Sequence, residues 1–337
     1  MTYFIRAACL KGYEDIVRSY GQNPTLLLKN AGILPSQLNE PETFIYYEHF
    51  LKALDNAKVE CRNELFGLEL GLRQNIQGLG MIHHYIYRQE TILDALIALN
   101  KYIHIYAEGF SISITLVEDQ YQIQFHHLQQ TFFTAQKSQF TLAACFSIVM
   151  ELLDVQDNVV SEIHLKQPTP NQSIHYFEHV FGCQIQFNEQ EDTIYIPQHW
   201  LMRKPVIPAT FNPLAIEAHS EIRKNTPLHP NDKIIDFIKQ TIKSLLATGE
   251  CNKDNIALCM GIHPKKLQRL LAENHTNYRA ITEEVRKQEA IKLLQQPLLP
   301  ISMIALKLGY ADIAIFSRNF KTWFKQSPSQ WRENIHL

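Results

Sequence analysis

The sequence lacks any apolar segment long enough to cross a membrane. A spanning helix needs about 18 or more consecutive apolar residues, and polar or charged residues interrupt every apolar run of this chain before that length. The opening residues, "MTYFIRAACLKGYE", contain no apolar run of signal-peptide length. We therefore expect a cytoplasmic protein that does not associate with membranes.

The patterns that mark metal sites, disulfide frameworks and common active sites are also missing. No Cys-x-x-Cys pair occurs among the six cysteines, which are Cys9, Cys61, Cys145, Cys183, Cys251 and Cys259. We expect them to be reduced packing residues. The adjacent pairs His83-His84 and His126-His127 are poorly spaced for chelation, because neighbouring side chains point in different directions. No Gly-rich phosphate loop, His-Glu-x-x-His or nucleophile elbow is present, so we expect no metal, no cofactor and no enzymatic activity.

A net charge of −2 hides an uneven distribution of charge along the chain. From residue 230 onward there are 16 Lys and Arg against 10 Asp and Glu, a net of +6. The remainder holds 16 against 24, a net of −8. A basic end joined to an acidic body indicates that only the end binds a polyanion, with ordinary solvated surface charge as the alternative.

The first two-thirds of the 337 residues mix helical and strand patterns. Amphipathic runs predict helices at 42–57, "ETFIYYEHFLKALDNA", and at 90–107, and a strongly apolar run predicts another at 140–155. Alternating runs at 110–119 and 121–129 predict a strand pair, and shorter alternating runs follow at 159–168, 184–189 and 192–197. We expect one α+β domain over residues 1–205.

The paired strands supply candidates for a ligand cavity. Five apolar or aromatic residues lie on them: Phe110, Ile112, Ile114, Tyr121 and Phe125. They either line a pocket for an effector molecule or form the ordinary core of the sheet.

The chain becomes polar and proline-bearing between the two halves. A linker is expected over 206–231, although "PLAIEAHSEIRK" inside it has a helical pattern. Every segment beyond is helix-like, which predicts an all-α domain over 232–337.

This basic end contains one motif twice. Residues 256–271 read "IALCMGIHPKKLQRLL" and residues 304–320 read "IALKLGYADIAIFSRNF". A helix-turn-helix needs a small residue on the first helix, a residue tolerant of positive φ in the turn and an apolar anchor on the second helix. The first copy supplies them as Ala257, Gly261 and Leu267, and the second as Ala305, Gly309 and Phe316. Two units are predicted, at about 254–272 and 301–322.

Helical periodicity sorts the side chains of each second helix by face. Packing Leu267, Leu270 and Leu271 inward turns Lys265 and Arg269 outward, flanked by Lys266 and Gln268. In the second copy the expected inward stripe is Ile313, Phe316, Phe320 and Trp323. Its expected outward and flanking residues are Ala314, Ile315, Arg318, Asn319, Lys321 and Lys325. Arg and Gln suit base edges, Ala and Ile suit thymine methyl groups, and Lys suits phosphates.

A long helix is predicted between the two units, over about 278–295. Its apolar side swings from Ile281 and Val285 to Ala290, Leu293 and Leu294, so it packs on a different body at each end. Units about 34 Å apart on such a helix would enter successive major grooves of double-stranded DNA.

At this point the last hundred residues resemble the DNA-binding domain of the AraC/XylS transcription regulators. The most specific matches are Ala305, Leu308, Gly309, Tyr310, Phe316, Ser317, Arg318, Phe320, Trp323, Phe324, Ser327, Pro328 and Arg332. The upstream body is similar to the effector-binding and dimerisation domain of one branch of that family, through "LFGLELGLRQNIQGLGMIHHYIYRQETILDAL" and "FGCQIQFNEQEDTIYIPQHWLMRKP".

Three residues depart from the family pattern. His263 stands where a Ser or Thr usually caps the first recognition helix, and it also joins the candidate DNA-contacting residues. Lys325 replaces a usual Gly, so a positive-φ turn there would be strained. Ile313 replaces a frequent Pro.

The resemblance implies a sequence-specific transcription regulator, expected to be an activator with a small-molecule effector. RNA polymerase and a second copy of the chain are the further expected partners. One alternative keeps DNA binding but gives the body a protein partner in place of a ligand. The other is a DNA-repair enzyme that uses the domain for targeting, which would need an activated thiol or zinc-bound cysteines.

Overall fold

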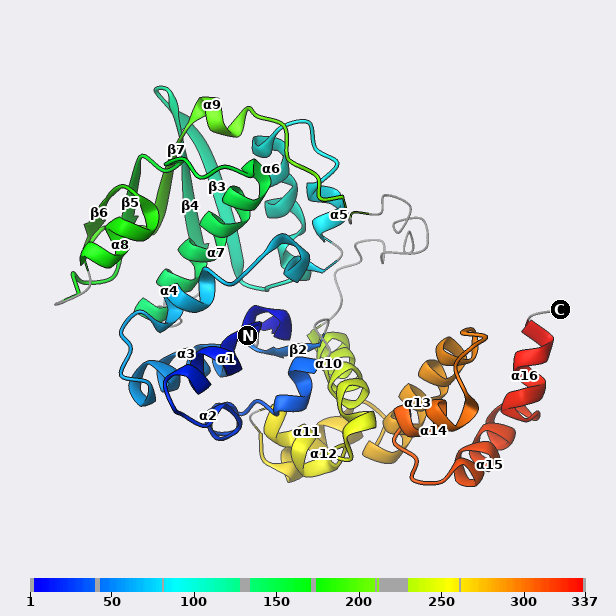
Figure 1. Ribbon diagram of the computed structural model, residues 1–337. Coiled ribbons are helices and arrows are strands. Elements are labelled where there is room, and N and C mark those ends of the chain that lie inside the picture. The colour runs from blue at the N-terminus through cyan, green and yellow to red at the C-terminus, as the bar shows by residue number, and fades with distance from the viewer. Residues whose placement is uncertain are drawn as a thin grey trace. The chain divides into compact units, whose positions relative to one another are not determined.

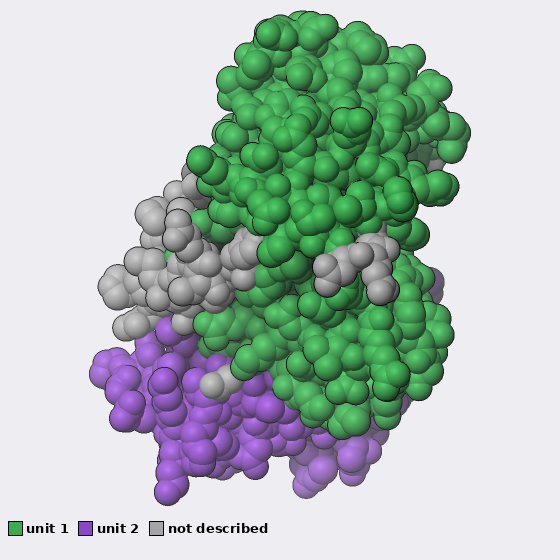
Figure 2. All heavy atoms as spheres, turned by 90° about the vertical axis from the view of Figure 1, so that its left-hand side faces the viewer, with its two compact units in different colours: residues 1–31, 45–225 green, residues 32–44, 226–337 purple. Residues whose placement is uncertain are grey.

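The computed structural model describes residues 3–39, 43–80, 82–127, 134–170, 174–209, 211, 230–260 and 262–335. They form two compact units, coloured separately in Figure 2. The N-terminal unit comprises residues 1–31 and 45–225, and the C-terminal unit comprises residues 32–44 and 226–337. Most of the expected linker, 206–231, falls outside the described residues, and the helical pattern within it, 213–224, lies wholly outside them.

The N-terminal unit mixes helices with two sheets (Figure 1). Its strands are β1 (Phe4–Arg6), β2 (Phe44–Tyr46), β3 (Phe110–Val117), β4 (Gln120–His127), β5 (Glu162–Leu165), β6 (Gln184–Phe187) and β7 (Thr193–Pro197). Its α-helices are α1 (Tyr13–Ser19), α2 (Pro24–Asn30), α3 (Tyr47–Glu60), α4 (Phe66–Gly71), α5 (Ile82–Ile86), α6 (Ile92–Tyr102), α7 (Ala135–Leu153), α8 (Ile174–Phe181) and α9 (Gln198–Leu201). Short 3-10 helices are η1 (Ala7–Leu10), η3 (Ile76–Leu79) and η4 (Ile103–Ile105). The α+β class predicted for this part is confirmed.

The larger sheet has five strands in the order β3-β4-β7-β5-β6. Strands β3 and β4 form the predicted hairpin, in a register that places Ile112 opposite Phe125. Strands β4, β7 and β5 pair antiparallel, whereas β5 and β6 pair in parallel on either side of α8. The expectation of helix from residue 42 is wrong at its start, because Phe44–Tyr46 pairs with β1 and the helix begins only at Tyr47.

Two glycines let α4 pack directly on α7. A β-carbon on Gly67 would collide with the carbonyl of Gln136, and one on Gly71 would lie 2.6 Å from the carbonyl oxygen of Phe140. The Gly67 amide also donates to Gln136 Oε1 at 2.7 Å. This close approach positions α7, which carries one wall of the cavity described below.

Every described element of the C-terminal unit is helical except Phe44, which begins β2, and this confirms the predicted all-α class. The α-helices are α10 (Pro230–Leu245), α11 (Lys253–Cys259), α12 (Pro264–Glu273), α13 (Tyr278–Leu294), α14 (Ile301–Lys307), α15 (Ile313–Phe324) and α16 (Pro328–Ile335). The 3-10 helices are η2 (Pro35–Asn39) and η7 (Leu246–Thr248).

A segment from near the start of the sequence packs with these helices. Residues 32–39, including η2, belong to the C-terminal unit, and η2 contacts α10. The Gln37 side chain is 1% exposed, and its Oε1 accepts from the Leu34 amide at 3.0 Å and from Cys259 Sγ at 3.2 Å. Ser36 Oγ donates to Glu250 Oε2 at 2.7 Å. No pattern in the sequence indicated this association.

Replacing Gln37 with Ala should loosen the start of the first helix-turn-helix. It leaves the Leu34 amide and the Cys259 thiol without their buried acceptor, a loss of about 1–3 kcal/mol. Hydrogen exchange on the full chain should show faster exchange in α11 than in α15. The exposed residue Asn39, at the end of the same 3-10 helix, changed to Ala is the matched control. Equal exchange in both variants would show that the Gln37 contacts do not support this unit.

Candidate nucleic-acid interface

The first helix-turn-helix is formed by α11 and α12. Asn252 caps α11 through the Asn255 amide at 2.9 Å, and Ala257 is fully buried at the crossing of the two helices. His263 caps α12, with its Nδ1 accepting from the Lys265 amide at 3.2 Å, and Pro264 occupies the first turn, where no amide hydrogen is required. Leu267 is buried. Gly261, the expected turn residue, lies outside the described residues.

The outer face of α12 is basic and open to solvent. Lys265, Lys266, Gln268 and Arg269 are all exposed, as is the capping His263. Arg269 forms an ion pair with Glu273 at 3.6 Å, but its side chain is 72% exposed and that of Glu273 is 66% exposed. An exposed pair of this kind contributes little energy, so the guanidinium can exchange Glu273 for another acceptor at small cost.

The second unit, α14 and α15, follows the same plan with a different surface. Ala305 and Phe316 are buried, and Asp312 caps α15 through the Ala314 amide at 2.7 Å. Exposed residues on α15 and just after it are Ala314, Ile315, Arg318, Lys321 and Lys325. The guanidinium of Arg318 forms no ion pair within the described part of the chain.

One position on α15 differs from the sequence-based sorting, and a second, the flanking Asn319, has a partner within the unit. Ile313 is 45% exposed and does not join the inward stripe, because it is the first residue of the helix and precedes the packed turn. Asn319 is half-buried, and its Nδ2 donates to the Tyr310 hydroxyl at 3.2 Å. Its carbonyl oxygen is therefore the group left for an outside contact.

The linker helix α13 fixes the turn of the second unit. Arg286 Nε donates to the Leu308 carbonyl at 3.0 Å, and its guanidinium lies 4.6 Å from the ring centroid of Tyr310. Gly309 has φ +72°, and a β-carbon there would collide with the carbonyl of Leu246, the first residue of η7. Sequence reasoning identified Gly309 but missed Arg286, which looks like an ordinary exposed helix residue when only periodicity is considered.

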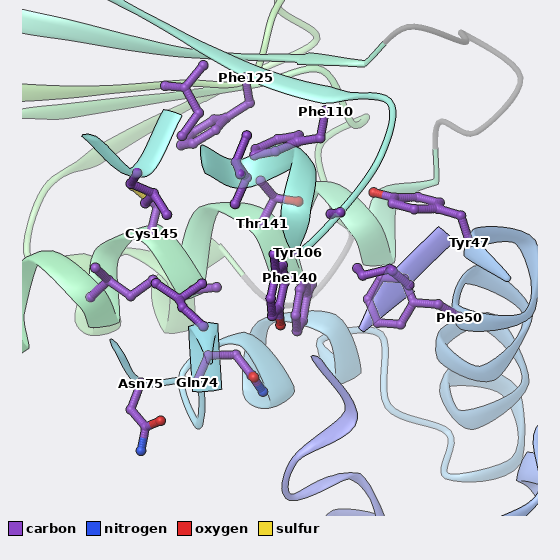
Figure 3. A pocket seen from close by; sticks show the side chains of 18 residues that line it. Tyr47, Phe50, Gln74, Asn75, Tyr106, Phe110, Phe125, Phe140, Thr141 and Cys145 are labelled. Carbon is purple, nitrogen blue, oxygen red and sulfur yellow. The ribbon is translucent and has the colours of Figure 1, made fainter. Parts of the chain in front are cut away.

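A second candidate site is a cavity inside the N-terminal unit (Figure 3). The volume of the cavity is about 80 Å³, which is room for several waters. Phe110, Ile112 and Phe125 line it from the sheet, as the alternating pattern suggested. Ile114 and Tyr121 lie on the same face of the hairpin but nearer its tip, and they do not line the cavity.

Much of the remaining wall comes from helices that the sequence predicted but did not associate with a cavity. Helix α3 contributes Tyr47 and Phe50, and α7 contributes Phe140 and Thr141 among others. The rings of Phe50 and Phe140 meet edge to face with centroids 5.1 Å apart. The sequence signal for this wall was the broad apolar face of the predicted helix at 140–155. That face is wider than packing against the sheet alone requires.

None of the described residues that line this cavity carries a charged side chain. Burial raises the pKa of Cys145 to about 12, and it also raises the pKa of the Tyr47 and Tyr106 hydroxyls, so all three are neutral near pH 7. The Lys137 ammonium lies beyond the lining, 5.2 Å from the ring centroid of Tyr47. The walls are therefore apolar, with a few neutral hydrogen-bonding groups.

The described residues show no cluster of three or more His, Cys, Asp or Glu side chains arranged to hold a metal ion. None of the described helices is both long and apolar enough to span a membrane.

Two family models match the chain. Residues 21–205 match the arabinose-binding domain of AraC transcription regulator, N-terminal, and residues 256–334 match a helix-turn-helix domain. The chain is 24% identical over 333 residues to the HTH-type transcriptional regulator VirS of Mycobacterium tuberculosis, covering 97% of this chain and 96% of the relative. It is 26% identical over 329 residues to the ornithine utilization regulator of Pseudomonas aeruginosa, covering 95% and 93%.

Among solved structures, the crystal structure of the transcriptional regulator CdpR from Pseudomonas aeruginosa is 21% identical to this chain. It matches with a TM-score of 0.36, covering 80% of this chain and 86% of that one.

Lys325 ends α15 in a left-handed conformation with φ 64°, the positive-φ turn for which the sequence predicted strain. Lys325→Gly should therefore stabilise the C-terminal unit by about 0.5–1 kcal/mol, because glycine adopts this conformation without a steric penalty. Lys325→Ala is the matched control, since it removes the same charge and keeps the β-carbon. Thermal unfolding that gives the same midpoint for both variants would contradict the backbone explanation.

Lys137 should make the stability of the N-terminal unit depend on pH. Burial lowers its pKa from 10.5 to about 7, with Asp192 opposing this shift and Lys166 adding to it. Between about pH 7 and 10.5 the unfolded chain binds more protons at this residue, so its contribution to stability rises with pH. Lys137→Met should reduce the gain in stability from about pH 7 to about pH 9. The exposed Lys101→Met should not, and chemical denaturation at each pH gives the comparison.

Proposed function

Because this chain belongs to the AraC family of transcription regulators, we propose that it is a sequence-specific activator controlled by a molecule bound in its N-terminal unit. Its role as a DNA-binding transcription regulator follows from the family. The activator role, the effector, the contact with RNA polymerase and the pairing of two protomers are the proposed parts. We assign it no catalytic activity.

The observation that carries the proposal is the pair of open, basic helix faces on α12 and α15. Each face belongs to the second helix of a helix-turn-helix, the helix that enters the major groove in this class of motif. Arg269 and Gln268 on α12 and Arg318 on α15 have the reach and geometry for bidentate contacts with base edges. Two such faces joined by one helix would read two successive stretches of the same duplex.

The two faces differ in chemistry, so we propose that they read different bases. Helix α12 presents adjacent lysines and a glutamine, whereas α15 presents Ala314 and Ile315 beside Arg318. The apolar pair suits the methyl group of thymine. Lys321 and Lys325, one turn further along, suit phosphates and would set affinity more than sequence preference.

Binding of the full chain to the DNA upstream of its own gene tests the proposal. Affinity should fall steeply as salt rises, since phosphate contacts release counterions, and it should exceed affinity for unrelated DNA of the same length. Affinity that is equal on both DNAs, or insensitive to salt, would rule out specific recognition.

Separate Arg269→Ala and Arg318→Ala variants test the residue assignments. Each should cost about 1–3 kcal/mol of discrimination against the wrong base at its own position. Lys292→Ala is the control, because Lys292 is an exposed basic residue of α13, paired with Glu289 and away from both recognition helices. Competition binding with single-base variants of the site provides the measurement. Unchanged discrimination in both arginine variants would remove these residues from the base-reading surface.

A further inference from the structure

The matching N-terminal domain is named after the sugar arabinose, but the cavity does not have the lining that a sugar requires. A pentose presents a hydroxyl on nearly every carbon, and each buried hydroxyl needs a hydrogen-bond partner. The walls are dominated by rings and aliphatic chains, including Tyr47, Phe50, Phe110, Phe125 and Phe140. A charged amino acid fits no better, because the described lining residues include no side chain of opposite charge.

We propose that this cavity binds an uncharged, mainly apolar effector carrying one or two hydrogen-bonding groups. The proposal rests on effector control of this regulator and names the chemical class of the effector. The aromatic walls set the size and shape of the effector that fits the cavity. A flat or chain-like apolar molecule would replace the few waters that the cavity admits.

Two hydroxyls on the cavity wall are available for the polar groups of such an effector. Figure 3 shows Tyr106 and Thr141 among the labelled side chains around the space. Within the described part of the chain, neither hydroxyl forms a hydrogen bond, whereas the amides of Gln74 and Asn75 in the lining are engaged. Gln74 Nε2 donates to the Leu70 carbonyl at 2.9 Å, and Asn75 Oδ1 accepts from the Gly78 amide at 3.0 Å.

The buried cations near the cavity do not convert it into a site for anions. Neither Lys137 nor Arg6 is part of the lining. The ammonium of Lys137 lies over the ring of Tyr47, 5.2 Å from its centroid, and the buried carboxylate of Asp192 attracts it from elsewhere. Arg6 interacts electrostatically with Tyr106, which lines the space, whereas Arg6 itself does not. An anionic head group placed in the cavity would therefore meet only neutral side chains.

Displacement of a fluorescent probe from the full chain tests the proposal. The uncharged probe N-phenyl-1-naphthylamine should bind saturably, with a rise in fluorescence as it leaves water. Decanol should displace it, and arabinose and ornithine should not. No saturable binding would overturn the proposal, as would displacement by arabinose, by ornithine, or by decanoate in place of decanol. DNA binding measured on the same preparation keeps a failure of this proposal distinct from a failure of the proposed function.

Filling the cavity tests whether the probe binds there. Ala144 lines the space, and Ala144→Leu should weaken probe binding at least about tenfold, which corresponds to ~1.4 kcal/mol. Ile114→Leu, on the β3–β4 hairpin and outside the cavity, is the control and should leave binding unchanged. Equal binding by both variants, with unchanged circular dichroism, would place the probe elsewhere and overturn the proposal.

Removal of single hydroxyls tests the polar contacts. Tyr106→Phe or Thr141→Val should weaken displacement by decanol by about threefold or more, corresponding to ~0.6 kcal/mol. Tyr121→Phe removes a hydroxyl outside the cavity and should have no effect. Unchanged displacement in both cavity variants would show that these hydroxyls do not bind the effector.

Discussion

The arrangement of the C-terminal unit depends on how closely one turn approaches the end of a helix. The backbone of Gly309 lies against the Leu246 carbonyl with no room for a side chain between them, in a conformation that only glycine adopts easily. Arg286 of α13 holds the neighbouring Leu308 carbonyl from another side. The turn that precedes α15 is thereby held by both η7 and α13. The orientation of α15 is therefore set by contacts with the elements that precede it, η7 and α13.

The N-terminal unit uses a related device for a different purpose. Gly67 and Gly71 lie one turn apart on α4 and bring its backbone against α7. One face of α7 packs against α4. The other face and the β3–β4 hairpin are far enough apart to leave a cavity between them. A tightly packed helix pair on one side thus permits a loosely filled space on the other. Rigid walls of this kind favour ligands that match the shape of the space.

Periodicity alone predicted the fold class of each half and the outward faces of both recognition helices, because burial follows the helical repeat wherever a helix packs on one side. It correctly turned Arg269 and Arg318 toward solvent. It failed at Ile313, where the helix has only begun and no packed neighbour exists. Alternation found the cavity face of the hairpin but not how far along it the cavity extends, so Tyr121 was included. Contacts such as Gln37 with Cys259, which join residues more than 200 positions apart, leave no local pattern in the sequence.

The packing of residues 32–39 against α10 and beside α11 makes the border between the two compact units discontinuous along the chain. A gene fragment that begins after the linker encodes both reading heads but omits the piece that buries Cys259. Exchange of sensory domains between relatives by recombination at the linker would pair a foreign segment with these helices. Residues 32–39 lie in the N-terminal part of the sequence but pack in the C-terminal unit. Substitutions in these residues and in the helices they contact are therefore coupled.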